Sequence, residues 1–330
     1  MTERTVLSPP QRHSGPPAGS STRSDAWLRG LSIAATATTF LLIAIGGLVR
    51  ATESGLGCTG WPKCTADRWL PPLEYHAVVE YSHRFTAFLD IVLVVLLAVV
   101  VWRRYSAIRR LKVPATAAVF LIFFQAVLGG TVVRGELHAL LVSAHLATAM
   151  VFAGVLVYVT VAAFTIDARI AGSVDGLTQL ARVSAAGTLV LIAVGAYVRG
   201  EGAGLVFPDW PLMNGRLVPS ISAAPAGVHF AHRVLALVVG LMVLVLAARA
   251  RREHPGRDAV AILASVAAIL FVAQVMIGAA NVWSRLAPAA VVAHVAVAGL
   301  AWGAVVATAA TSRAVPGRSR RISEQAEEPR

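Results

Sequence analysis

The chain has 330 residues, of which 57% are hydrophobic and only 14% are charged, and its mean hydropathy is +0.70. This composition excludes an ordinary soluble domain and indicates an integral membrane protein. The net charge of +12 does not indicate nucleic-acid binding, because the lysines and arginines gather in a few loops and in both tails and are not interleaved with aromatic residues.

The N-terminal segment, residues 1–26, is rich in proline, serine and charged residues. Such a segment buries too little apolar surface to fold alone, so we expect a disordered cytoplasmic tail. It lacks a short apolar stretch followed by a small-residue cleavage site. The first long apolar run is therefore predicted to be an uncleaved membrane span and not a signal peptide.

Eight apolar stretches follow, each close to the roughly 20 residues that cross a hydrocarbon core. A lipid-exposed backbone must satisfy its own hydrogen bonds, and no stretch has the alternating pattern of a barrel strand, so all eight are predicted to be helices. The fold class is an all-α integral membrane protein with eight transmembrane helices. The spans are placed at Leu31–Val49, Val78–Trp102, Pro114–Val133, Leu137–Phe164, Leu180–Val198, Ala226–Ala248, Ala259–Val282 and Pro288–Ala310.

The orientation follows from arginine clusters beside the ends of the second and sixth spans, because basic loops stay in the cytoplasm. These clusters are Arg103, Arg104, Arg109, Arg110 and Lys112, and then Arg249, Arg251, Arg252 and Arg257. An even number of spans returns the chain to its starting side, so both termini, including the tail 312–330, are expected to be cytoplasmic. The long loops 50–77 and 199–225 are then outside.

One spacing, 149 residues, relates most of the polar landmarks. It maps Gly46 to Gly195, Arg50 to Arg199, Trp61 to Trp210, His83 to His232, Arg84 to Arg233, Gln125 to Gln274, Gly129 to Gly278 and His145 to His294. Four helices per half give both copies the same orientation, which predicts a parallel repeat of two four-helix bundles. The halves are 27–166 and 180–311, joined by a linker at 167–179.

Each half carries one histidine on its second helix and one on its fourth, namely His83 with His145 and His232 with His294. Each lies about 8–12 Å from the outer start of its helix at 1.5 Å per residue. Two imidazoles at one depth, without carboxylate or thiolate partners at ligand spacing, favour a bis-imidazole haem over zinc or a di-iron centre. The alternative is that each histidine hydrogen bonds between helices.

Glu80 precedes His83 by three residues and shares its helical face, one turn toward the outside. A carboxylate there could act as a general base or stabilise positive charge on a ring substituent. Its alternative role is to hydrogen bond a ligand histidine or an arginine. His229 stands at the equivalent position, so the asymmetry separates a reacting site from an electron-transfer site.

Four arginines near the outer side, Arg50, Arg84, Arg199 and Arg233, are candidates for pairing with haem propionates. Snorkelling to lipid headgroups is the alternative.

Cys58 and Cys64 lie in the first outer loop and have no counterparts in the second half. A structural disulfide is the favoured interpretation, since the outside permits oxidation, and a redox role is the alternative.

Several further polar residues receive weaker interpretations. Gln125 and Gln274 are expected to hydrogen bond between helices. Asp90, seven residues after His83 and replaced by Val239 in the other half, could serve a proton route or be a locally satisfied acid. No ligand role is assigned to His13, His76, His138 or His254.

With these residues identified, the chain resembles the haem A synthase family over roughly residues 27–310. The resemblance is carried by Glu-x-x-His-Arg at 80–84, its His-x-x-His-Arg counterpart at 229–233, His145, His294 and the cysteine pair. It implies haem O as a substrate held by His83 and His145, and haem b as a cofactor held by His232 and His294. It also implies stepwise oxidation of a porphyrin methyl group to a formyl group with oxygen from water, Glu80 as the catalytic carboxylate, and a Cys58–Cys64 disulfide.

We expect a bacterial-type cytoplasmic membrane location, and the depth of the histidines places the haem sites toward the outer side. The expected partners are haem O synthase, cytochrome oxidase assembly proteins and the lipid bilayer; a homo-oligomer is left open.

Two other function classes compete with this interpretation. A di-haem b electron-transfer cytochrome explains the four histidines but not the Glu80/His229 difference. A parallel-repeat transporter would place its polar residues near the bilayer midplane and not toward one side.

Overall fold

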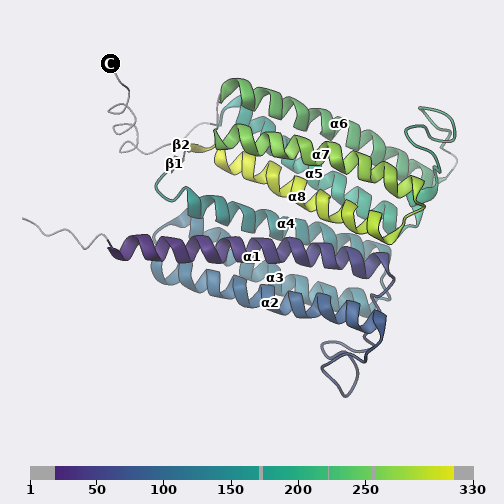
Figure 1. Cartoon of the computed structure of the whole chain (residues 1–330), viewed down its shortest axis with the longest axis horizontal. Coiled ribbons are helices and arrows are strands. Elements are labelled where there is room, and N and C mark those ends of the chain that lie inside the picture. The colour runs from purple at the N-terminus through teal and green to yellow at the C-terminus, as the bar shows by residue number, and fades with distance from the viewer. Residues whose placement is uncertain (1–18, 171–173, 222, 255–257, 316–330) are drawn as a thin grey trace, which may run out of the picture.

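The computed structural model describes residues 19–170, 174–221, 223–254 and 258–315, and Figure 1 shows the arrangement of its elements. In chain order these are α1 (Gly19–Ala51), α2 (Tyr75–Arg104), α3 (Arg109–Arg134), α4 (Ala139–Phe164), β1 (Arg169–Ile170), α5 (Gly176–Gly200), η1 (Ala203–Leu205), α6 (Ala224–Glu253), α7 (Ala259–Trp283), α8 (Pro288–Thr311) and β2 (Ala314–Val315).

The helices α1 to α8 confirm the eight predicted spans. Each is long and apolar enough to cross a membrane, with lengths from 24 residues in α8 to 33 in α1. Arginines lie in the last turns of α2 and α6, where a positive charge is favourable at the helix C-terminus and long side chains can leave the apolar region.

Two boundaries differ from the sequence predictions. Helix α1 begins at Gly19, inside the segment 1–26 for which a disordered tail was expected, and its Asp25 accepts a hydrogen bond of 2.8 Å from the hydroxyl of Tyr105. Helix α5 begins at Gly176, inside the expected linker, because the Asp175 carboxylate caps it by accepting from the Thr178 N–H at 2.7 Å. That hydrogen bond lowers the pKa of Asp175. Residues 1–18 and 316–330 of the expected tails lie outside the described residues.

The helices form two groups, α1 to α4 and α5 to α8, which lie side by side in Figure 1. Within the groups, sequential helices pack against each other, and α1 also contacts α4 as α5 contacts α8. Between the groups, α1 contacts α8, and α4 contacts both α5 and α8. One buried apolar cluster fills the first group, and a second extends from the other group into the seam between them.

Small residues let the two groups approach closely at this seam. A Cβ added at Gly303 of α8 would lie 2.7 Å from the Phe40 ring of α1, and one at Gly154 of α4 would lie 3.0 Å from Trp302 of α8. The Trp302 indole also donates to the buried Met150 carbonyl oxygen of α4 at 2.8 Å. Glycine contacts of this kind are typical of helix packing in membranes.

Two short β-strands, β1 and β2, were not part of the all-α prediction. β1 and β2 form a short antiparallel ladder in which Arg169 pairs with Val315 and Ile170 with Ala314. The ladder joins the connection between the groups to the end of α8, and both ends of the described chain lie at this end of the bundle (Figure 1). The assignment of this end to the cytoplasm stays a prediction from the arginine-rich loops.

The spacing of 149 residues recurs in the backbone. The peptide bonds Trp61–Pro62 and Trp210–Pro211 are both cis. The turns before α4 and α8 each contain two successive residues with positive φ, Glu136 and Leu137 in the first and Arg285 and Leu286 in the second. These correspondences lie in loops, where helix packing alone does not impose a conformation.

Candidate functional site

Four half-buried histidines occupy matching places in the two helix groups: His83 on α2, His145 on α4, His232 on α6 and His294 on α8. His83 and His145 lie close enough for their imidazoles to interact electrostatically, and the same holds for His232 and His294. The structure therefore brings together the two histidines of each predicted pair.

A glycine on the preceding helix faces each of these imidazoles. The distance between a Cβ built on the glycine and the histidine Cε1 atom is short in all four cases. It is 3.1 Å for Gly46 and His83, 3.3 Å for Gly129 and His145, 2.8 Å for Gly195 and His232, and 3.3 Å for Gly278 and His294. Any larger residue would press on the ring. The sequence revealed these glycines as repeat positions, but their role becomes visible only in three dimensions.

The surroundings of the histidines fit a haem with two imidazole ligands. Among the described residues, no group of three or more histidine, cysteine or acidic side chains is placed to hold a metal ion. The Nδ1 atoms of His83, His232 and His294 are buried and have no hydrogen-bond partner in the described structure. Paired imidazoles, each packed closely against a glycine, would suit ligation of a haem iron.

Gln125 lies beside His145. Its side-chain amide contacts the Thr148 hydroxyl, and an amide atom lies 2.9 Å from His145 Nδ1. The orientation that satisfies the surrounding groups places the amide nitrogen there, where it donates to Nδ1 and to the His145 carbonyl oxygen (3.3 Å), while the amide oxygen accepts from the Ala149 N–H at 2.9 Å. Gln125 thus forms the predicted contact between α3 and α4. The equivalent oxygen of Gln274 has no partner in the described structure.

A Gly195→Ala change tests the glycine support. The new Cβ would lie 2.8 Å from His232 Cε1, closer than carbon atoms approach without displacement, so the ring must move. We expect loss of a haem held by His232 and His294 and no change at His83 and His145, measured as haem content per protein and by optical spectrum. The change itself favours helix formation by roughly 0.5–1 kcal/mol, so weakening of α5 would not explain the loss.

The matched control is Gly30→Ala in α1, where an added Cβ meets nothing within 4 Å. This variant should keep its full haem content. If Gly195→Ala also kept it, the interpretation of the glycine as a support for a ligand histidine would be wrong.

Glu80 is buried, with 3% of its surface exposed, and both carboxylate oxygens are engaged. One accepts from the Cys58 backbone N–H at 2.7 Å, and the other pairs with the Arg84 guanidinium. Arg84 in turn donates to the carbonyl oxygens of Gly60 (2.7 Å) and Lys63 (3.1 Å). The first outer loop and α2 therefore fix this carboxylate from two sides, one turn from His83.

The predicted disulfide between Cys58 and Cys64 is present, with a Cα–Cα distance of 4.5 Å. Both cysteines are almost fully buried and pack on Ala77 and Tyr81 of α2. The disulfide closes the short loop whose carbonyl groups hold Arg84 and whose Cys58 N–H holds Glu80. Its place thus supports a structural role in positioning the carboxylate.

The second half repeats this arrangement without the carboxylate. Arg233 donates to the carbonyl oxygens of Asp209 (3.1 Å) and Leu212 (2.9 Å), which are the counterparts of Gly60 and Lys63. Its Nε also donates to His229 Nε2 at 3.2 Å. Where the first half has Glu80 paired with Arg84, the second therefore has a hydrogen-bonded imidazole.

Apolar residues replace the disulfide in the second half. Phe207 and Met213 stand at the positions of Cys58 and Cys64, and they pack with Ala226, the counterpart of Ala77. The Phe207 ring also lies 5.2 Å from the His229 ring. Both loops are thus anchored to the second helix of their half, one by a disulfide and one by apolar packing.

A carboxylate organises the tip of the second outer loop. Asp209 accepts from the backbone N–H groups of Asn214 and Gly215, each at 2.7 Å. The Gly215 hydrogen bond in particular lowers the pKa of Asp209. Its contribution to loop stability is present above the ordinary aspartate pKa and is lost as the pH falls through the lowered value.

The four candidate propionate arginines divide into two kinds. Arg84 and Arg233 are committed to loop carbonyls and to their neighbours on the same helix. Arg50 and Arg199, at the ends of α1 and α5, lie close enough to repel each other electrostatically, and each has a buried Nε without a hydrogen-bond partner in the described structure. Glu53 lies close enough to Arg199 to attract it, and a further anionic group beside the two cations would also be favourable.

Two polar contacts confined to the first half were not foreseen in detail. The fully buried Asp90 accepts from the Thr39 hydroxyl of α1 at 2.8 Å, and its other oxygen has no partner in the described structure. His76 shares a hydrogen bond of 2.9 Å with the buried Ser54 hydroxyl. Sequence spacing gave no signal for Thr39 or Ser54, because both contacts join residues far apart in the chain.

Comparison with known proteins gives consistent matches. The family model "COX15-CtaA: Cytochrome oxidase assembly protein" matches residues 29–78 and 72–306. Curated relatives named heme A synthase include those of Halalkalibacterium halodurans (34% identity, covering 66% of this chain and 75% of the relative) and Symbiobacterium thermophilum (34%, 76% and 84%). A third, from Bacillus licheniformis, is 30% identical over 81% of this chain and 90% of its own length.

Proposed function

Because the chain belongs to the COX15-CtaA family of cytochrome oxidase assembly proteins, we propose that it is a haem A synthase, an oxidoreductase that converts haem O to haem A. The observation that carries the assignment of the reacting half is the Glu80 arrangement. The two halves share paired histidines, backing glycines and arginine-bound loops, but within the described residues only the first has a fixed carboxylate beside its histidines.

In this proposal the first half binds the substrate haem O. His83 and His145 would hold it, and Gly46 and Gly129 leave room for their rings. Arg50 and Arg199 supply positive charge near the outer ends of α1 and α5, where a propionate would be neutralised. The substrate would then present one edge to Glu80, one helical turn farther out than His83.

The reaction removes electrons and protons from a methyl group. Conversion of the methyl group to hydroxymethyl takes one water and releases two electrons and two protons, and conversion to the formyl group releases two more of each. Glu80 would accept a proton as the water oxygen is added, acting as a general base. The Cys58 N–H and Arg84 hold its two oxygens, so the carboxylate needs no reorganisation to act.

The second half would hold haem b as a resident cofactor between His232 and His294. When bound, haem b supplies one-electron redox chemistry. This chain's contribution there is to fix both imidazoles through Gly195 and Gly278 and to replace the reactive carboxylate by His229. An unreactive edge suits a group that carries electrons and is not itself oxidised.

A di-haem b electron-transfer cytochrome is the competing function. It accounts for the two histidine pairs equally well. It gives no reason for a buried carboxylate held by a disulfide-closed loop in one half only, which is why we favour the enzyme.

The assignment is tested by co-expressing the protein with a source of haem O in cells that lack haem A, then extracting and chromatographing the haems. Haem A and its hydroxylated intermediate are the expected products. A folded, haem-loaded protein that yields neither would contradict the proposal, whereas stable binding of haem b in both halves would favour the electron-transfer alternative.

Removing the disulfide tests its positioning role. A Cys58→Ser, Cys64→Ser double variant should keep both haems but convert haem O about 10-fold more slowly, because the Cys58 N–H would no longer be held against Glu80. The measurement is the rate of product formation with haem content as the reference. Unchanged conversion would assign the disulfide to stability alone.

We also propose the bacterial cytoplasmic membrane as the location, with the paired-histidine sites toward the outer side. The source of the substrate would be a haem O synthase, and the consumer of the product a terminal oxidase under assembly. These partners follow from the proposed reaction.

A further inference from the structure

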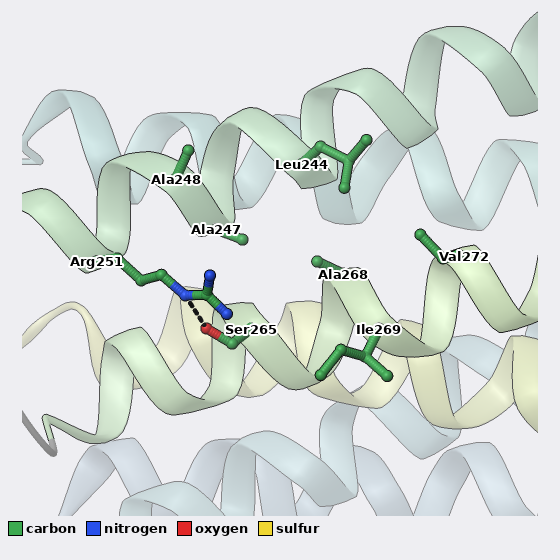
Figure 2. A pocket seen from close by; sticks show the side chains of 8 residues that line it. All are labelled: Leu244, Ala247, Ala248, Arg251, Ser265, Ala268, Ile269 and Val272. Carbon is green, nitrogen blue, oxygen red and sulfur yellow. Dashed lines mark hydrogen bonds between the residues drawn. The ribbon is translucent and has the colours of Figure 1, made fainter.

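A groove of about 350 Å³ lies between α6 and α7, toward the arginine-rich end of the bundle (Figure 2). Most of its lining is apolar, and Arg251 and Ser265 form its polar end, where Arg251 Nε donates to the Ser265 hydroxyl at 2.9 Å. Leu244, Ile269 and Val272 are 45–65% exposed, so the groove opens on the outer surface of the helix bundle. In a membrane-spanning chain this surface faces lipid.

The first half has a hydrogen bond at the equivalent positions, but between different side chains. Trp102 and Thr116 are the counterparts of Arg251 and Ser265, and the Trp102 indole donates to the Thr116 hydroxyl, also at 2.9 Å. Larger residues stand opposite several other lining positions. They are Val99 for Ala248, Val119 for Ala268, Phe120 for Ile269 and Phe123 for Val272. At these four positions the second half has the smaller side chains, and it has the cation Arg251 where the first half has the Trp102 indole.

Arg251 has no acidic partner among the described residues. The nearest acid along the helix, Glu253, is taken by Arg249, which donates to it through both Nε and a terminal nitrogen at 3.0 and 2.8 Å. Side chains of α6 lean toward its N-terminus, so Arg251 reaches back along the groove, as Figure 2 shows. Its guanidinium can therefore offer its terminal nitrogens to an anion at the polar end of an apolar groove.

We propose that this groove is a binding site for an anionic phospholipid. The phosphate accepts from Arg251, and an acyl chain lies along Leu244, Ala247, Ala268 and Val272. Basic pockets between helices near the cytoplasmic side suit such headgroups, and arginine suits phosphate oxygens through paired donors. The site is independent of the haem chemistry, because it lies at the end of the bundle away from the two outer loops.

The test uses the full-length, haem-loaded protein, delipidated in detergent and titrated with phosphatidylglycerol or phosphatidylethanolamine of identical acyl chains. Bound lipid is counted by native mass spectrometry. Wild type should prefer phosphatidylglycerol. Arg251→Gln should weaken its binding about fivefold, as expected for one arginine near the membrane surface. Ala268→Val, which copies Val119 of the first half, should weaken both lipids by narrowing the groove.

Arg252→Gln is the matched control. It removes the same charge from the adjacent, exposed position, which does not line the groove, and should leave lipid binding as in wild type. Equal binding of the two lipids to wild type would overturn the proposal. So would equal effects of Arg251→Gln and Arg252→Gln, unchanged binding to Ala268→Val, or a lipid-free dimer in which a second copy covers the groove.

Discussion

Replacing Glu80 by glutamine should slow the oxidation of haem O by about 10²- to 10⁴-fold, the usual contribution of a positioned general base, while both haems stay bound. The glutamine oxygen can still accept from the Cys58 N–H, so the loop keeps its contact with α2. The side chain can no longer take up a proton or pair with Arg84 as a charge. Conversion is measured by chromatography of the extracted haems over time, with the optical spectrum reporting haem binding.

Glu74→Gln is the control for this experiment. Glu74 is an exposed carboxylate at the N-cap of the same helix, and its side chain makes no capping hydrogen bond. That variant should convert haem O at the normal rate. Normal conversion by Glu80→Gln would refute the role of the carboxylate in the reaction. Loss of haem from the first half would instead make Glu80 a structural residue.

Replacing His232 by alanine should remove haem b from the second half and abolish net conversion, although haem O still binds in the first. The expectation follows from the proximity of His232 and His294, since one imidazole alone would hold the proposed haem more weakly than two. The matching His83→Ala variant should lose haem O and keep haem b. Identification of the retained haem by extraction and chromatography separates the two cases.

The two alanine variants thus make opposite predictions about which haem is lost. If both lost the same haem, or if each lost both, the assignment of one haem to each half would be wrong. His254→Ala serves as the control, because this histidine lies at the other end of α6, beside Asp258, and should affect neither haem.

Much of this architecture follows from the sequence because its determinants are local. A run of about 20 apolar residues must become a helix in lipid whatever its neighbours are, so α1 to α8 were predictable. The histidine pairs and the contrast between Glu80 and His229 emerged from the internal spacing, because the repeat supplies a comparison within one chain. The cysteine pair was predictable from its place in an outer loop.

Other features depend on contacts between distant segments and left no pattern in the sequence. The last residues of the expected tail belong to α1, where Asp25 accepts a hydrogen bond from Tyr105, 80 residues away in the chain. The backing of each histidine by a glycine depends on how neighbouring helices face each other. The same holds for the contacts of Arg84 and Arg233 with loop carbonyls, which their spacing did not indicate. The propionate contacts of these arginines stay a prediction.

The matching hydrogen bonds of Arg84 and Arg233 bear on how such a molecule can diverge after duplication. In both halves the arginine ties its loop to the helix through backbone carbonyl groups, which any loop sequence provides. The residue one turn before the arginine is therefore free to change without detaching the loop. Two copies of an ancestral four-helix unit could in this way keep the same arginine–loop hydrogen bonds and the same architecture. A few substitutions near the arginine could then give the two copies different functions.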